Sequence, residues 1–151
     1  KNCMSHLLLK DTFDNFSFIE GEITTFNKFT ISGFLQEDFF DEKPEETYSR
    51  WNKIRDFCFQ IIRGKRTPLG FKIVLALPED QIPHFLTAHG LTGYRPEEIR
   101  GLYLNFHYDG HHLQCITGTS LNTFTMDKSI EREWDQEVKN ILKSRSIEGD
   151  Y

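Results

Sequence analysis

The sequence has few of the residues and segments by which disulfide-rich, metal-binding and membrane proteins are identified. It holds only three cysteines, Cys3, Cys58 and Cys115, and they are widely spaced. A disulfide framework or a zinc ribbon needs paired or closely spaced cysteines, so we predict reduced thiols that fill the core. No run approaches the roughly 20 apolar residues of a membrane span, and no basic-then-apolar leader is present. We therefore predict a cytoplasmic protein with no membrane partner.

The sequence also lacks the short motifs that indicate a particular reaction. It contains no G-x-S-x-G, H-E-x-x-H, Cys-x-x-Cys or glycine-rich dinucleotide motif. The segment "GKRT", residues 64–67, lacks the upstream glycine of a Walker A loop. Cys58 and Cys115 fall at apolar positions, which disfavours a nucleophilic thiolate. We predict no cofactor and no metal, and we keep an enzyme with a site assembled from loops as the less favoured alternative.

Aromatic side chains and an uneven distribution of charge stand out in what the sequence does contain. Aromatic residues make up 14% of the 151 residues, and 14 residues are Phe. This composition predicts a folded single domain over residues 1–151. The net charge is −5, but residues 37–47 carry six acids against one lysine, and residues 50–72 carry seven bases against one aspartate. Charge asymmetry of this kind can mark a partner surface.

Hydrophobic periodicity and turn residues predict an α+β protein with antiparallel sheets and helices packed on one side. The acidic stretch 37–47 is expected to be a loop, and the strand over 71–78 to be covered on both faces. The predicted elements are, in order, a helix over 1–9, a three-strand meander over 13–36 with turns at Glu20-Gly21 and Asn27-Lys28, a helix over 50–64 capped by Ser49, a strand over 71–78, a helix over 79–90, three strands over 101–127 and a helix over 129–146.

Three of the six histidines lie in "GLYLNFHYDGHHLQCITG", residues 101–118. Asp109-Gly110 is a strong signal for a two-residue hairpin turn, which would pair His107 with His112. Two imidazoles at this tip lack the further ligands of a zinc site, so we predict a polar face that can meet a partner. Because side chains alternate across a strand, one hairpin face is apolar and the other carries Tyr103, Asn105, His107, His112 and Gln114.

A short internal repeat indicates how the halves are built. "NKFTIS", residues 27–32, recurs as "NTFTMD", residues 122–127. Each copy would end a three-strand meander, with a helix before it and a helix with an early Trp after it. We therefore predict two pseudo-repeats of strand–helix–three strands–helix, over about 1–66 and 67–151, joined around a pseudo-twofold axis. The first strand of the first copy is missing from the chain, and we expect residues to precede Lys1.

Three segments carry a family resemblance: "LLLKDTFDNFSFIEGEITTFNKFTISG", "RDFCFQIIRGKRTPLGFKIV" and "GLYLNFHYDGHHLQCITGTSLNTFTMDKSIEREWD". They resemble an uncharacterised bacterial domain family of unknown function, over nearly the whole chain. The resemblance implies no assigned activity and no catalytic residues. The order of elements is similar, in pattern only, to the DNA sliding clamp and to the TATA-binding-protein-like fold; "YDGHHLQCITGTS" resembles a clamp hairpin that ends in Thr-Gly/Ala-Thr.

These observations together favour a non-enzymatic binding module for nucleic acid or for a protein partner. The alternative is a protein-interaction or oligomerisation domain without nucleic acid, anchored by Phe39 and Phe40 beside the acidic loop. The oligomeric state is left open. Besides the polar hairpin face, the candidate binding residues are the cations of the basic segment: Arg63, Lys65, Arg66, Lys53 and Arg55.

Overall fold

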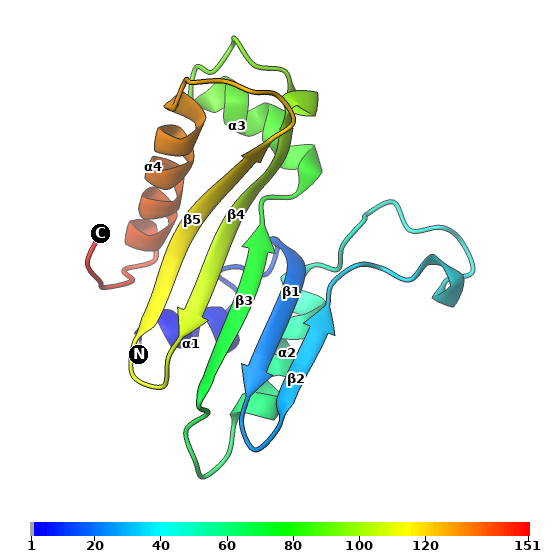
Figure 1. Cartoon of the computed structure of the whole chain (residues 1–151), viewed down its shortest axis with the longest axis vertical. Coiled ribbons are helices and arrows are strands. Elements are labelled where there is room, and N and C mark those ends of the chain that lie inside the picture. The colour runs from blue at the N-terminus through cyan, green and yellow to red at the C-terminus, as the bar shows by residue number, and fades with distance from the viewer. Residues whose placement is uncertain (1) are drawn as a thin grey trace.

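The computed structural model describes residues 2–151 as one five-stranded sheet with helices along it (Figure 1). Short 3₁₀ helices cover Glu37–Phe39, Glu79–Gln81 and Pro96–Glu98. The predicted α+β class is confirmed. The longer elements are, in chain order, α1 (Asn2–Leu8), β1 (Ser17–Thr24), β2 (Lys28–Ser32), α2 (Trp51–Ile62), β3 (Gly70–Ala76), α3 (Ile82–Ala88), β4 (Ile99–Tyr108), β5 (Leu113–Leu121) and α4 (Ser129–Ser144).

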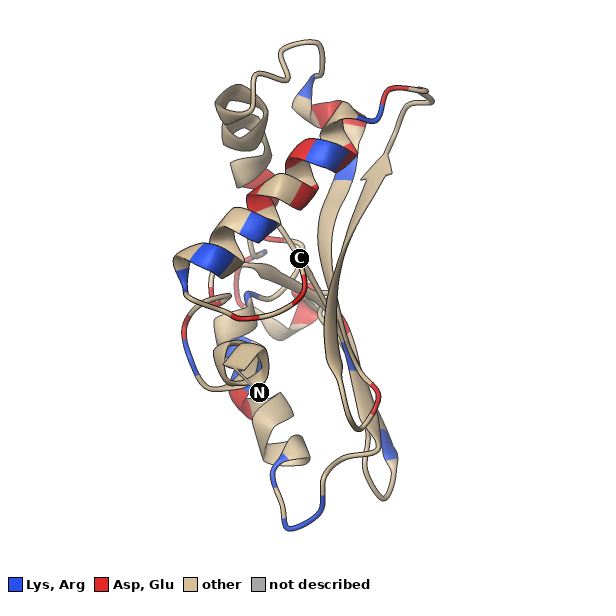
Figure 2. Cartoon of the chain, turned by 90° about the vertical axis from the view of Figure 1, so that its left-hand side faces the viewer, with Lys and Arg blue, Asp and Glu red and all other residues tan. Residues whose placement is uncertain are grey.

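The sheet has the strand order β2-β1-β3-β4-β5, and every neighbouring pair is antiparallel. One of its faces is apolar: Ile73 and Leu75 of β3 are fully buried and lie opposite Phe106 and Leu104 of β4. The helices all lie on this side, as the view along the sheet shows (Figure 2). Lys72, between the buried residues of β3, is exposed on the other face, which no helix of residues 2–151 covers. We call this uncovered side the open face.

Two tryptophans anchor the helices to the sheet. Trp51 begins α2 and Trp134 lies in α4, and both side chains are fully buried. The Trp51 Nε1–H donates to the Leu7 carbonyl at 2.8 Å, and the Trp134 Nε1–H donates to the Tyr103 carbonyl at 2.9 Å. A buried indole needs such a partner for its one polar atom. The apolar stripes read from the sequence therefore face the core as expected, with α2 against β1 and α4 against β5.

The prediction of a three-strand meander in each half, over 13–36 and over 101–127, is wrong. Glu20-Gly21 is not a turn but lies inside β1, where Gly21 pairs with Ile31 of β2 and with Ile73 of β3. Only the second predicted turn, near Asn27, joins two strands. In the second half β5 ends at Leu121, so each half contributes one hairpin rather than a meander.

The repeat is not confirmed either. The first copy, residues 27–32, contains strand β2, whereas the second copy, residues 122–127, forms an irregular loop before α4. The predicted pseudo-twofold axis also conflicts with the sheet. Since β1 and β4 both run antiparallel to β3, they run in the same direction on either side of it. The predicted axis would have to superpose β1 of the first half on β4 of the second. A twofold axis perpendicular to the sheet reverses strand direction, so it cannot superpose two strands that run the same way. A twofold axis along β3 keeps the direction but would put half of the helices on the open face.

Two smaller expectations also fail. The strand β3 is covered on one face rather than on both, because Lys72 is exposed and Val74 is only partly buried. The residue that caps α2 is Arg50, with no side-chain capping bond, rather than Ser49. Within residues 2–151, none of the helices combines the length and the apolar character needed to cross a bilayer.

Candidate functional site

Three loops meet at one end of the sheet, the lower end in Figure 1. They are the β1–β2 turn, the loop 63–69 that leads from α2 to β3, and the β4–β5 loop. The backbone N–H of Leu69 donates to the carbonyl of Thr24 at 2.9 Å. Gly110 approaches from the other side: a Cβ there would lie 3.1 Å from the Leu69 carbonyl oxygen. The loop 63–69 is therefore held between the two hairpins.

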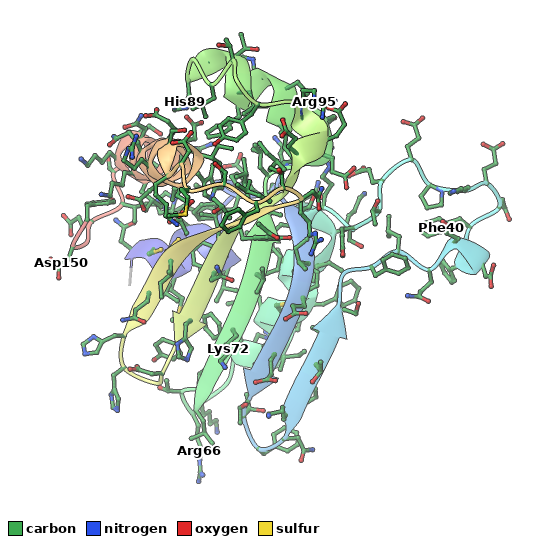
Figure 3. The ribbon with its side chains drawn as sticks, turned by 45° about the horizontal axis from the view of Figure 1, so that its top comes forward. Phe40, Arg66, Lys72, His89, Arg95 and Asp150 are labelled. Atoms are coloured by element: carbon green, nitrogen blue, oxygen red, sulfur yellow. The ribbon has the colours of Figure 1, made fainter. Side chains whose placement is uncertain are left out.

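This convergence gathers cations from distant parts of the sequence. We call the group the cationic end; its members are Lys28, Arg63, Lys65, Arg66 and Lys72. Lys28 belongs to β2 and is 3.8 Å from Glu22, while Lys72 belongs to β3. Within residues 2–151, the four members other than Lys28 have no ion-pair partner. Figure 3 shows Arg66 extending from the lower end and Lys72 on the open face.

A row of polar residues crosses all five strands of the open face next to the cationic end. The strand register places Lys72 between Glu22 on β1 and His107 on β4. It continues to Thr30 on β2 and Gln114 on β5. A shallow cavity of about 260 Å³ lies at this row, and its lining includes Glu22, Lys72 and His107. The row therefore offers donors of both amide and cationic type to a ligand on the sheet.

The predicted hairpin exists, but its register is shifted by two residues. His107 pairs with Gln114 rather than with His112, and Tyr103 pairs with Gly118 rather than with Ile116. The connection is therefore a four-residue loop and not a two-residue turn. A shift of two keeps the faces, since side chains alternate with a period of two. Tyr103, His107 and Gln114 are thus on the open face as expected, whereas His112 moves into the loop.

Asp109 fixes the shape of this loop. One oxygen of its carboxylate accepts the backbone N–H of His111 at 2.8 Å and of His112 at 2.7 Å. These backbone hydrogen bonds, with a smaller contribution from the two imidazoles, lower the pKa of Asp109. Gly110 has φ of 97°, a left-handed conformation that favours glycine. These features fix the backbone that carries the two imidazoles at the tip.

Farther along the open face, Tyr103 and Asn105 provide an aromatic ring and an amide. The Tyr103 ring occupies the space above Gly101, where a Cβ would collide with the phenol. Partial burial, followed by the nearby Tyr48, raises the pKa of Tyr103, so the ring stays neutral at physiological pH. Asn105 Nδ2 donates to the Ile116 carbonyl at 3.2 Å. Four residues of strand, about 13 Å, separate Tyr103 from His107.

Two of the candidate cations do not reach this site. Lys53 and Arg55 belong to α2, on the side of the sheet that the helices cover (Figure 2). Arg55 is also engaged, since its Nε and Nη2 donate to the two carboxylate oxygens of Asp14 at 2.8 and 2.9 Å. This bidentate pair ties α2 to the segment before β1. Of the predicted cations on and after α2, only Arg63, Lys65 and Arg66 therefore lie on the loop at the cationic end, and their role in binding stays a prediction.

Neither the cysteines nor the histidines form a metal centre in the described part of the chain. Among residues 2–151, no three side chains of His, Cys, Asp or Glu are placed to hold an ion together. Cys58 is fully buried, and Cys3 and Cys115 are partly buried. Burial raises the pKa of Cys58 to about 12, and burial with the nearby Cys3 and Asp135 raises the pKa of Cys115 to about 12. These thiols are therefore protonated at neutral pH.

A larger cavity, of about 700 Å³, lies between β5, α4 and the C-terminal residues. Its one lysine is paired, because Lys139 lies 3.1 Å from Asp135, which also accepts the Thr117 hydroxyl at 3.1 Å, and the other charged residues of its lining are the acids Glu148 and Asp150. At the cationic end most of the charges are unpaired instead. An anion could form charge-assisted hydrogen bonds with these unpaired cations. The cationic end and the adjoining polar row are therefore the candidate site.

Sequence reasoning missed Lys28, Glu22 and Lys72 as members of this site. Lys72 interrupts an apolar strand, and that interruption was the available signal for an open face. Lys28 and Glu22 carry no such signal, because only the placement of β1 and β2 beside β3 brings them to the row.

A model of the family described as "Family of unknown function (DUF5721)" matches residues 6–150, and the chain therefore belongs to this family. No curated protein and no solved structure matches the chain. Nothing supports the resemblance to the sliding clamp or to the TATA-binding-protein-like fold.

Proposed function

We propose that the chain is a non-enzymatic module that binds single-stranded nucleic acid on the open face of its sheet, with the phosphates at the cationic end. The observation that carries the proposal is the group of unpaired cations on converging loops next to an uncovered, polar sheet face. Phosphates supply most of the affinity of such complexes through counterion release. A single strand also exposes its bases, which can stack on aromatic rings and bond to amides.

Each part of the site has a role in this proposal. Lys65, Arg66 and Lys72 bind phosphates, and His107 and Gln114 donate to the strand as it crosses the sheet. Tyr103 offers its ring as a stacking surface about 13 Å away. The overall charge of −5 resides elsewhere, since six acids lie in residues 37–47, outside the site. A local positive surface is compatible with a net acidic chain.

The test is a titration of a labelled single-stranded oligonucleotide by fluorescence anisotropy over a series of salt concentrations. The triple variant Lys65→Gln, Arg66→Gln and Lys72→Gln removes three phosphate contacts. We expect it to weaken binding at least about tenfold and to reduce the salt slope by about 2, since each contact to a single strand contributes about 0.7.

A matched control separates a site from general charge. Lys10→Gln, Lys53→Gln and Arg132→Gln remove three exposed cations from the helix-bearing side and change the net charge equally. We expect this control to bind as the wild type does. Absence of wild-type binding at low salt, or equal losses in both triple variants, would overturn the proposal and leave the protein-interaction domain as the better hypothesis.

A further inference from the structure

An acidic segment extends from the sheet beyond its β2 edge. Residues 34–48, which we call the arm, leave the end of β2 and return to α2 (Figure 1). Its base is fixed: Phe34 and Tyr48 form an isolated bridge, Leu35 N–H donates to the Thr47 carbonyl at 2.9 Å, and Ser49 N–H donates to the Gly33 carbonyl at 2.9 Å. These bonds direct the arm away from the sheet of its own chain.

The tip of the arm carries exposed aromatic rings among carboxylates. Phe39 is 85% exposed and Phe40 is 41% exposed, and their rings meet edge to face with centroids 5.7 Å apart. Figure 3 shows Phe40 on the arm, away from the sheet. The arm holds six acidic residues against Lys43 alone. Two large apolar side chains in water at the end of a charged loop are typical of a contact surface.

The cationic end has the complementary composition. Phe26, 87% exposed, and Leu69, 70% exposed, lie on two of its converging loops among the cations. Each surface thus has an apolar centre and a charged surround, and the signs are opposite. The two surfaces lie at opposite ends of β2, because Lys28 begins this strand and Ser32 ends it just before the arm. The base of the arm keeps it from folding back along its own β2.

The strand β2 is also an edge of the sheet. Gly33 N–H donates to the Ile19 carbonyl at 2.8 Å, toward β1. Because backbone groups alternate direction along a strand, those of Lys28, Thr30 and Ser32 point outward. No strand of residues 2–151 pairs with them. An unpaired edge of this kind is a template for another strand.

We propose that a second copy of this chain pairs its β2 antiparallel with this β2, centred on Thr30, and that each arm then lies across the cationic end of the other copy. Antiparallel pairing brings the end of one β2 beside the start of the other, so both arms reach their targets at once. Each arm limb of five or six residues spans up to about 20 Å. That length crosses three strands spaced about 5 Å apart. The result is a closed twofold dimer with one continuous sheet.

This pairing is independent of the proposed function, since it needs no nucleic acid. Its test is sedimentation velocity of the protein alone over a concentration series, with charge reversals on the two surfaces. One variant carries Asp38→Lys, Asp41→Lys and Glu42→Lys on the arm, and the other carries Arg63→Glu, Lys65→Glu and Arg66→Glu on the cationic end, so that each surface changes the sign of its net charge. All six side chains are exposed, so neither variant disturbs the core.

Each charge-reversed variant alone places like charges at both contacts, and we expect its self-association to weaken roughly tenfold or more relative to the wild type. An equal mixture of the two variants restores opposite charges at both contacts, because one chain then has a positive arm and a positive end and the other has a negative arm and a negative end. We expect the mixture to dimerise about as strongly as the wild type. This recovery is specific to the arm-to-end arrangement.

Two further variants test the other features. Thr30→Pro removes an outward-pointing N–H that makes no hydrogen bond within its own chain, and Phe39→Ser removes an exposed ring. We expect both variants to weaken the dimer and to leave the thermal unfolding midpoint of the monomer unchanged. A monomeric wild type at high concentration overturns the proposal, and so does a mixture that fails to recover or a dimer that is unaffected by Thr30→Pro. None of these results depends on whether the chain binds an oligonucleotide.

Discussion

At the scale of single residues, Trp51 links three parts of the fold. Its indole is fully buried, its ring lies 5.6 Å from that of Phe18, and its N–H donates to the carbonyl of Leu7 in α1. Trp51→Phe would leave that carbonyl without a partner in the core. We expect a loss of about 1–3 kcal/mol in the free energy of unfolding.

Urea denaturation followed by circular dichroism measures this loss. Phe57→Ala is the matched control, because Phe57 belongs to the same helix but is 66% exposed. We expect the control to change stability by about 0.5 kcal/mol or less. Equal stability of Trp51→Phe and the wild type would show that the indole N–H contributes nothing.

His89 joins the end of α3 to α4. Its Nδ1 is 2.8 Å from Glu133 Oε1 and its Nε2 is 2.8 Å from Glu137 Oε1. Burial lowers the pKa of His89, but the hydrogen bonds and charges of the two glutamates outweigh burial, and the pKa is raised. An imidazole that donates from both nitrogens is the protonated form. The three side chains therefore act as a charged clasp between the two helices.

The clasp makes stability depend on pH. Because the folded pKa lies above the unfolded value of about 6.5, the stabilisation is fully present below that pH and is lost as pH rises through the folded pKa. We expect the free energy of unfolding of the wild type to fall from about pH 6 to about pH 8.5 by more than that of His89→Gln.

Urea titrations at a series of pH values provide the comparison. His6 acts in the opposite sense, since burial and then the charges of Lys10 and Arg145 lower its pKa. It is present in both proteins, so its contribution cancels in the difference. Parallel pH profiles for the wild type and His89→Gln would contradict the clasp.

At the scale of elements, the β4–β5 loop depends on two residues. Asp109 accepts two backbone N–H groups, and Gly110 has a positive φ. We expect Asp109→Ala to lower the free energy of unfolding by about 0.5–2 kcal/mol, as the loss of a helix-capping side chain does. Gly110→Ala adds strain of about 1 kcal/mol. The midpoint of thermal unfolding measures both effects, and His111→Ala, at an exposed residue of the same loop, is the control. Unchanged midpoints in both Asp109→Ala and Gly110→Ala would contradict the role of these residues in fixing the loop.

The sequence could predict the helices better than the strands. Apolar stripes place α2 and α4 correctly, because burial on one helix face has a clear period. The false turn at Glu20-Gly21 has a packing cause: a Cβ at Gly21 would lie 3.2 Å from the Phe18 ring, so the glycine makes room in a strand. No local pattern shows that ring.

The repeat is not confirmed, for a different reason. Phe29 and Ile31 of β2 pack against the core, whereas Phe124 and Met126 in the similar stretch are 90% and 82% exposed. There, Asp127 accepts the backbone N–H and the hydroxyl of Ser129 at the start of α4. A residue whose side chain is hydrogen-bonded to the start of a helix cannot also continue a strand. The two similar sequences therefore adopt different structures.

At the scale of the whole molecule, the candidate site comes from the sheet order. The polar face of the β4–β5 hairpin could be predicted because it follows from alternation within one hairpin. The proximity of that face to Lys28, Lys72 and the loop 63–69 could not be predicted, because it requires β3 to lie between the two hairpins. Sequence separation hides such neighbours, and only the tertiary arrangement brings their charges together.

The two proposals also meet at this scale, because nucleic acid and the arm of a second copy would use the same cations. Lys65 and Arg66 cannot neutralise a phosphate and an arm carboxylate together at full strength. A bound oligonucleotide should therefore favour the monomer. By linkage, an oligonucleotide at 100 times its dissociation constant opposes dimerisation by about 100-fold for each cationic end that it occupies.

Sedimentation velocity of the wild type with increasing oligonucleotide tests this competition. We expect the dimer to give way to an oligonucleotide-bound monomer, and the apparent affinity for oligonucleotide to fall as protein concentration rises. Added salt at the same ionic strength is the control for general screening, which acts on exposed charges without occupying the site. A dimer that binds oligonucleotide with undiminished affinity would show that the arm and the nucleic acid use separate surfaces.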